Sequence, residues 1–184
     1  MEEMKVQNVV ARVDLYVRVP LEKAAIELPN TIYNPEEFPG LIIRLNPEEE
    51  KPSKTALVFS SGRVVITGAK DEKDVEKAIE RLVKLLEKIG VKVTKKPTYE
   101  IQNIVVSGNL NMRLNLNNLI FKLENAEYEP EQFPGLIYKI YPDKSITFLL
   151  FGSGRFVCTG GRRIEEIKKA IKDLKKKLEE IEKG

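Results

Sequence analysis

The sequence predicts an α+β fold built from two similar halves. Three segments of the chain occur twice in the same order, and internal repeats of this kind determine the architecture of a fold. In each half, short apolar segments broken by turn signals precede a long segment with apolar residues at helical spacing. Strands followed by a long helix are typical of the α+β class.

The repeated segments keep a nearly constant separation. "VQNVVA" at 6–11 matches "IQNIVV" at 101–106, and "YNPEEFPGLIIRL" at 33–45 matches "YEPEQFPGLIYKI" at 128–140, both 95 residues later. "LVFSSGRVVITGAK" at 57–70 matches "LLFGSGRFVCTGGR" at 149–162, which is 92 residues later. The difference lies between Arg44 and Phe59, where the charges and prolines of "NPEEEKPSK" predict a loop. We expect one repeat in residues 1–95 and the other in residues 96–184.

The same series of elements is predicted in each repeat. A first strand around residues 5–11 leads into "PLEKAAIEL", a short helix with Pro20 at its start. Strands follow, separated by turn signals at "NPEEFPG", the charged loop and "SSGR". Apolar residues at helical spacing from Val75 to Ile89 then predict a long helix that ends at Gly90. The spacing from Ile164 to Ile181 predicts a core-facing helix, with a short coiled coil as the alternative.

The composition limits the classes of function. The net charge of +3 is too small to indicate a nucleic-acid-binding protein. The chain has no histidine and one cysteine, Cys158, so an intramolecular disulfide, the usual zinc ligands and a histidine general base are all excluded. Carboxylate or lysine chemistry remains open on these grounds.

The sequence shows neither a membrane-spanning segment nor the pattern of a signal peptide. No apolar stretch approaches the roughly 20 residues that span a bilayer. The first residues, "MEEMKVQNVV", are acidic where a signal peptide is basic. We expect a soluble intracellular protein.

Side-chain alternation assigns the strand residues to faces. The helices suffice to cover one face of such a sheet, yet the other face carries apolar and small polar residues and little charge, unlike the wet face of an ordinary antiparallel sheet. This second face is either buried by another sheet or a dimer partner, or it is a wide surface for a wide ligand. Its residues are Asn8, Val10, Leu57, Phe59, Val65 and Thr67, with Asn103, Val105, Leu149, Phe151, Val157 and Thr159 in the second repeat.

The minor groove of DNA fits such a surface. Its floor distinguishes mainly A·T from G·C pairs, because only A·T pairs lack the protruding guanine amino group. Small apolar side chains can press against that smooth floor, and the asparagines can hydrogen-bond the base acceptors. Phe59 and Phe151 stand at the entrance to a turn, where folding alone favours a polar residue. Such phenylalanines can insert between base steps.

These segments resemble the family of TATA-box-binding proteins, in its archaeal form. The resemblance runs from Lys5 onward and rests on "YEPEQFPGLIY", on the duplicated phenylalanine before a Ser-Gly-Arg turn, and on "ITGAK" with its partner "CTGGR". It implies a saddle, with a curved ten-stranded antiparallel sheet and four helices on its convex face. This family is itself the standard example of wedge insertion into the minor groove.

The resemblance also implies a function. The chain would be a general transcription initiation factor that binds the minor groove of the TATA box, bends the DNA by phenylalanine insertion, and recruits transcription factor B and, indirectly, RNA polymerase. It would act at the nucleoid of an archaeal cell, in the cytoplasm, and would bind neither a membrane nor a small-molecule substrate. It would have no enzymatic activity, cofactor or metal.

Family roles can be carried over wherever the motifs match. The inserted pairs would be Phe38 with Phe59 and Phe133 with Phe151. The groove-floor residues would be the remaining ten of the second face: Asn8, Val10, Leu57, Val65, Thr67, Asn103, Val105, Leu149, Val157 and Thr159. The phosphate contacts would be Arg44, Arg63, Lys70, Lys139, Arg155 and Arg162, with Ser61 and Ser153 supporting the turns. Glu129 and Glu131 would bind transcription factor B.

Each assignment has a structural alternative. Phe38 and Phe133, beside proline and glycine, could simply close a turn; the asparagines could be strand-start residues that cap a loop; and Thr67 and Thr159 could be ordinary strand ends. The sequence also departs from the family in its longer "NPEEEKPSK" loop, in Arg12 on the concave face where a small residue is usual, in Gly161 and in the lysine-rich end. Arg12 could reach a phosphate at the edge of the groove or perturb the contact there.

Two other functions compete with DNA binding. The apolar sheet face could bind a protein, which would make the chain an interaction scaffold. Saddle domains also occur fused to nucleases and glycosylases, but the two repeats account for nearly every residue here and leave no room for a catalytic domain.

Overall fold

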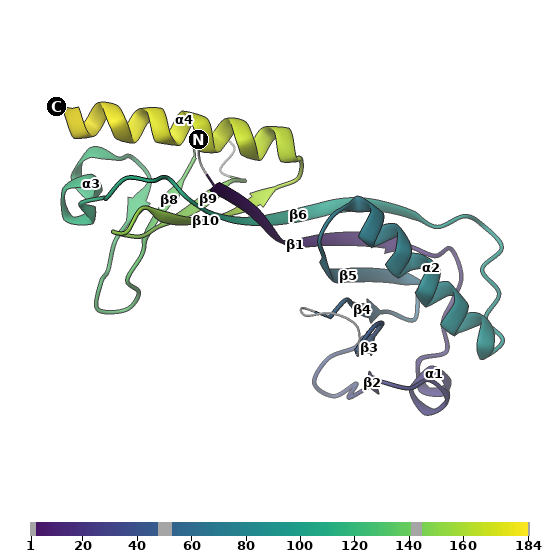
Figure 1. The fold of residues 1–184 in the computed structure, drawn as a ribbon. Coiled ribbons are helices and arrows are strands. Elements are labelled where there is room, and N and C mark those ends of the chain that lie inside the picture. The colour runs from purple at the N-terminus through teal and green to yellow at the C-terminus, as the bar shows by residue number, and fades with distance from the viewer. Residues whose placement is uncertain (1–2, 48–52, 141–144, 184) are drawn as a thin grey trace. The chain divides into compact units, whose positions relative to one another are not determined.

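The computed structural model of the protein describes residues 3–47, 53–140 and 145–183 (Figure 1). Within these ranges the chain forms ten strands of one antiparallel sheet and four helices, which confirms the α+β prediction. Residues 48–52 of the predicted "NPEEEKPSK" loop lie outside the described residues. No helix in the described part of the chain is long and apolar enough to cross a membrane.

Both repeats contain the same series of elements. The first contains β1 (Glu3–Asp14), α1 (Leu21–Glu27), β2 (Thr31–Ile32), β3 (Leu41–Arg44), β4 (Thr55–Val58), β5 (Arg63–Ala69) and α2 (Glu72–Lys88). The second contains β6 (Thr98–Asn109), α3 (Leu116–Lys122), β7 (Ala126–Glu127), β8 (Leu136–Lys139), β9 (Thr147–Leu150), β10 (Arg155–Gly161) and α4 (Ile164–Lys183).

The chain folds into two compact units. We call residues 8–102 the N-unit, and residues 1–7 together with 103–184 the C-unit. Neighbouring strands follow the order β2-β3-β4-β5-β1-β6 in the N-unit and β1-β6-β10-β9-β8-β7 in the C-unit. The repeat boundary expected between residues 95 and 96 stays a prediction.

The strand register aligns equivalent residues in both units. In the N-unit, Ile42 pairs with Leu57, Leu57 with Val65, and Val65 with Arg12. In the C-unit, the corresponding row runs from Ile137 through Leu149 and Val157 to Ser107. The register shifts once in each unit, between Val9 and Ala11 on β1 and between Cys158 and Gly161 on β10. A shift of this kind is a β-bulge, which bends the strand locally.

One long helix covers one face of the strands in each unit (Figure 1). Asp71 caps the N-terminus of α2, where its carboxylate accepts a hydrogen bond from the Asp74 N–H at 2.8 Å. The helix ends just before Gly90, as predicted. In α4 the buried side chains lie at the core-facing positions, so the core-facing interpretation of this helix is confirmed. They are Ile167, Ala170, Ile171, Leu174 and Leu178.

A largely buried ion pair connects Lys54, the last residue of "NPEEEKPSK", to Asp74 of α2. Lys54 Nζ lies 3.0 Å from Asp74 Oδ1, and the two side chains are only 10% and 15% exposed. The Lys70 N–H donates to the other Asp74 carboxylate oxygen at 3.0 Å, and the Lys54 N–H donates to Asn46 Oδ1 at 2.9 Å. Burial alone would raise the pKa of Asp74, but the Lys70 N–H and the Lys54 ammonium outweigh it and lower the pKa below its ordinary 3.8.

We predict that Asp74→Asn destabilises the protein by about 3 kcal/mol at pH 7, because it removes the negative charge that lies 3.0 Å from the buried Lys54 ammonium. A group whose pKa is lowered by folding stabilises the fold above its ordinary pKa and loses this effect as the pH falls through the folded value. The difference between wild type and variant should therefore shrink as the pH falls below 3.8. Urea unfolding at several pH values measures this difference in the free energy of unfolding. Glu80→Gln, at an exposed position of α2, is the control and should cost less than about 0.5 kcal/mol. A pH-independent difference would contradict the ionic role.

Candidate nucleic-acid interface

The predicted groove residues all lie on the strand face that the long helices leave uncovered. We call this face the outer face of each unit, defined by Asn8, Val10, Leu57, Val65 and Thr67 in the N-unit and by Asn103, Val105, Leu149, Val157 and Thr159 in the C-unit. Every one of these ten side chains is half-buried. Val64 and Ile66, which flank Val65 on β5, are fully buried. The strand faces therefore separate as parity predicts.

The register adds residues to the outer face that sequence reasoning missed. Ile42 pairs with Leu57 and Thr55 pairs with Thr67, while Ile137 and Thr147 hold the same places in the C-unit. All four are half-buried. Cross-strand partners share a face. The alternation within "GLIIRL" and "GLIYKI" contains this signal, but the sequence does not fix which strands are neighbours.

The two asparagines are held by the neighbouring strand at the β-bulges. Asn8 Oδ1 accepts a hydrogen bond from the Gly68 N–H at 2.7 Å, and Asn103 Oδ1 accepts one from the Gly160 N–H at 2.6 Å. Asn103 Nδ2 also donates to Thr159 Oγ1 at 3.2 Å. Both asparagines lie inside long strands, so the interpretation of them as strand-start caps is wrong. Thr67 and Thr159 likewise lie within strands and do not end them.

The four predicted wedge residues form two ring pairs. The ring centroids of Phe38 and Phe59 lie 5.7 Å apart, and those of Phe133 and Phe151 lie 5.9 Å apart, both in edge-to-face geometry. Phe133 is 36% exposed and the other three rings are half-buried. The rings are therefore accessible at the surface.

Glycine allows each ring pair to lie close to the backbone. A Cβ at Gly135 would stand 2.7 Å from Phe133 Cε2 and 3.0 Å from Phe151 Cε1, and a Cβ at Gly40 would crowd the first pair in the same way. The "FPG" segment thus does close a turn, since the Phe133 N–H donates to the Glu129 carbonyl at 3.0 Å. It also places its phenylalanine against the ring of the Ser-Gly-Arg turn.

The Ser-Gly-Arg turns place a phenylalanine and an arginine at the two ends of one tight hairpin. The Phe151 N–H donates to the Arg155 carbonyl at 3.0 Å, and the Gly154 N–H donates back to the Phe151 carbonyl at 2.9 Å. Ser153 Oγ accepts from the Arg155 N–H at 3.3 Å. Gly154 has φ +92°, a conformation that L residues with a Cβ rarely adopt. The first turn, from Phe59 to Arg63, has the same contacts.

The predicted phosphate contacts are all exposed. Arg44 and Lys139 are the last residues of β3 and β8 and pair with the outer-face threonines of the next strand. Arg63 and Arg155 are the first residues of β5 and β10. Lys70 and Arg162 directly follow those two strands. Cations therefore stand at both ends of the strands that form the outer faces.

The acidic segment of the second repeat is a surface turn. Glu129 and Glu131 are both exposed. Glu129 lines a small cavity of about 130 Å³ together with Phe133 and Ile137. The segment is therefore open to a partner beside the second ring pair.

Cys158 offers no reactive thiol. It lies on the buried face of β10. Burial, with a smaller contribution from the charge of Glu166, raises its pKa to about 12. The thiol is protonated at neutral pH, and its role is packing.

The comparisons agree with this geometry. The sequence model of the family described as "Transcription factor TFIID (or TATA-binding protein, TBP)" matches residues 3–89 and 98–181. The chain belongs to the TATA-binding protein family. The TATA-box-binding protein of Pyrobaculum calidifontis is 46% identical over 177 residues, which cover 96% of this chain and 86% of the relative. That of Thermococcus celer is 41% identical over 180 residues, which cover 98% and 93%.

A solved structure shows the same fold. The structure titled "Methanococcus jannaschii TBP" is 39% identical, covers 97% of this chain and 99% of its own, and has a TM-score of 0.86. The similarity to archaeal TATA-box-binding proteins expected from the sequence is thus confirmed. The family consists of transcription factors and not of enzymes.

We predict that the Ser-Gly-Arg turn of this TATA-binding protein family member requires its glycine. In Gly154→Ala the new Cβ would stand 2.1 Å from the Met112 carbonyl oxygen at φ +92°. The variant should therefore lose about 1–3 kcal/mol of stability. Gly152→Ala is the matched control two residues earlier, where the nearest atom, the Leu114 carbonyl oxygen, is 3.6 Å from the added Cβ. Thermal unfolding compares the two variants, and equal stabilities would contradict the assigned turn geometry.

Proposed function

We propose that the protein is a general transcription initiation factor that binds the minor groove of A·T-rich TATA DNA with its two outer faces. The observation that carries the proposal is the composition of these faces. Ten half-buried residues, all apolar or small and uncharged, form the predicted contact surface, and cations stand at the ends of their strands. Neutral side chains suit the groove floor, and flanking cations suit the phosphates on either side.

The asparagine geometry supports selection of A·T pairs. Asn8 Oδ1 and Asn103 Oδ1 accept hydrogen bonds from glycine N–H groups, which turns the amide nitrogens toward a ligand. Asn103 Nδ2 carries two N–H groups, of which one donates to Thr159 Oγ1 and the other can donate to a base. An amide N–H₂ group donates, and the minor-groove edge of an A·T pair presents only acceptors, adenine N3 and thymine O2. A G·C pair adds the guanine amino donor, which would face the asparagine donor and obstruct the apolar side chains.

The ring pairs support a bent complex. Apolar side chains that insert between base steps unstack them and kink the duplex toward the major groove, and TATA-box-binding proteins are themselves the standard example. Here Phe59 and Phe151 stand at the entrance of rigid hairpin turns, and Phe38 and Phe133 support them from the side. A preformed pair can enter a base step without first ordering its side chains.

The exposed acidic turn supports recruitment of a partner. We assign Glu129 and Glu131 to binding of transcription factor B, which in turn brings RNA polymerase to the promoter. Two exposed carboxylates at a tight turn complement a basic protein surface. Their turn also carries Phe133, so a partner bound there would lie next to the distorted DNA.

We predict preferential binding and bending of TATA duplexes. Fluorescence anisotropy should give tighter binding to a TATA duplex than to a G·C-rich duplex of the same length, and energy transfer between dyes at the duplex ends should report bending of the TATA duplex only. Equal and weak binding to both duplexes without bending would overturn the proposed function. Capture of a protein that persists after DNA digestion would then favour the scaffold alternative.

We predict that alanine substitutions at wedge and at phosphate-contact positions change DNA binding in different ways. Phe151→Ala should lower affinity and bending together, because the ring both enters the base step and creates the kink. Arg155→Ala should mainly weaken binding and reduce the slope of log K against log salt by about one unit, because it removes one phosphate contact. The two variants change opposite ends of the same turn, so each is the control for the other. If Phe151→Ala left bending and affinity intact, the wedge assignment would be wrong.

A further inference from the structure

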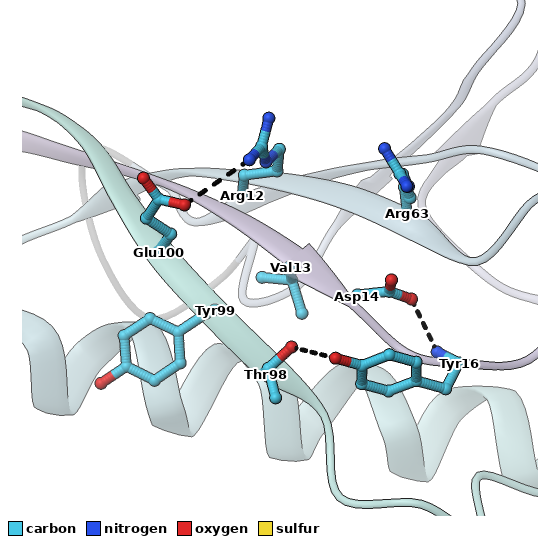
Figure 2. A pocket seen from close by; sticks show the side chains of 8 residues that line it. All are labelled: Arg12, Val13, Asp14, Tyr16, Arg63, Thr98, Tyr99 and Glu100. Carbon is cyan, nitrogen blue, oxygen red and sulfur yellow. Dashed lines mark hydrogen bonds and ion pairs between the residues drawn. The ribbon is translucent and has the colours of Figure 1, made fainter.

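An ion pair stands on the outer side of the N-unit sheet, where family resemblance leads us to expect a small residue (Figure 2). Arg12 Nη2 on β1 lies 3.5 Å from Glu100 Oε2 on β6, and both side chains are 56% exposed. The pair borders a hollow of about 250 Å³ that Asp14, Arg63 and Thr98 also line. It has no counterpart in the C-unit, since the residues 95 positions away from Arg12 and Glu100 are Ser107 and Lys5.

Arg12 lies between a groove-floor position and a phosphate position. The register places Arg12 opposite Val65 and places Asp14 opposite Arg63. Arg12 and Arg63 are therefore diagonal neighbours, whose backbones are about 7–8 Å apart in an antiparallel pair. Val10 precedes Arg12 by two residues on the same face of β1. In Figure 2 both guanidinium groups project from the side of the sheet opposite the helix.

We propose that Arg12 is an additional DNA contact, and that it exchanges Glu100 for a backbone phosphate when the duplex binds. This inference rests on the proposed function. A guanidinium can form two parallel charge-assisted hydrogen bonds with a phosphate. An ion pair as exposed as Arg12–Glu100 is weak in water. The phosphate therefore replaces the carboxylate at little cost.

Glu100 then acts as an intramolecular competitor of the DNA. In the free protein its carboxylate holds the guanidinium that the phosphate needs, and in the complex it stands near a polyanion. Both effects lower affinity. The geometry thus makes the Arg12–Glu100 pair a determinant of affinity that is confined to the N-unit.

The test is a mutant cycle on a TATA duplex at several salt concentrations. Arg12→Ala should weaken binding and reduce the slope of log K against log salt by about one unit. The affinity ratio of wild type to Arg12→Ala should therefore shrink by about fourfold between roughly 50 and 200 mM salt. Glu100→Gln should tighten binding by about two- to fivefold. This gain in affinity should be smaller in the Arg12→Ala background, because the substitution of Glu100 then no longer frees a guanidinium for a phosphate.

Controls separate this inference from folding, from bulk charge and from the proposed function. Lys84→Ala removes an exposed cation from α2, on the helical side of the same unit, and should change the salt slope by much less than Arg12→Ala. Thermal unfolding of each variant verifies that it is folded. If wild type prefers the TATA duplex but Arg12→Ala has unchanged slope and affinity, this inference alone is overturned. Weaker binding by folded Glu100→Gln would also overturn it. If wild type shows no preference for TATA, the proposed function fails and this inference fails with it.

Discussion

Side chains alternate between the two faces of a strand, and in each unit the long helix covers only one of those faces. This constraint determines how the other residues are used. On β5, Val64 and Ile66 are fully buried, whereas Val65 and Thr67 face outward and remain half-buried. β10 repeats the division with Phe156 and Cys158 against Val157 and Thr159. A strand that is apolar on both faces needs a core on one side and a ligand or partner on the other.

The outer face is shaped by main-chain geometry as much as by its side chains. The bulges bring the Gly68 and Gly160 N–H groups to the asparagine oxygens, which orients two amides that would otherwise rotate freely. The "FPG" turns bring a second phenylalanine against each hairpin ring. Preorganisation of this kind lowers the conformational entropy lost on binding. It also explains why the glycines recur in both repeats along with the contact residues.

Local patterns predicted most of the fold, and contacts between distant segments account for what was missed. Parity within "RVVITG" is enough to assign Val65 and Thr67 to one face, and the spacing from Val75 to Ile89 is enough to place α2. The register between strands is not encoded locally, so Ile42 and Ile137 were not recognised as outer-face residues. The Arg12–Glu100 pair joins residues of different repeats, and the sequence gives no sign that these two side chains meet. The roles of the site residues toward DNA are proposals that the geometry supports.

In the proposed complex the outer faces read the floor of the minor groove. Inosine·cytosine pairs test this mode of binding most directly, because they present the minor-groove edge of A·T, without the guanine amino group, together with the major-groove edge of G·C. Binding should be measured on one TATA site made in three versions, with A·T, inosine·cytosine or G·C pairs. We expect the inosine·cytosine duplex to bind nearly as tightly as the A·T duplex. An inosine·cytosine duplex that binds as weakly as the G·C duplex would contradict this mode of binding.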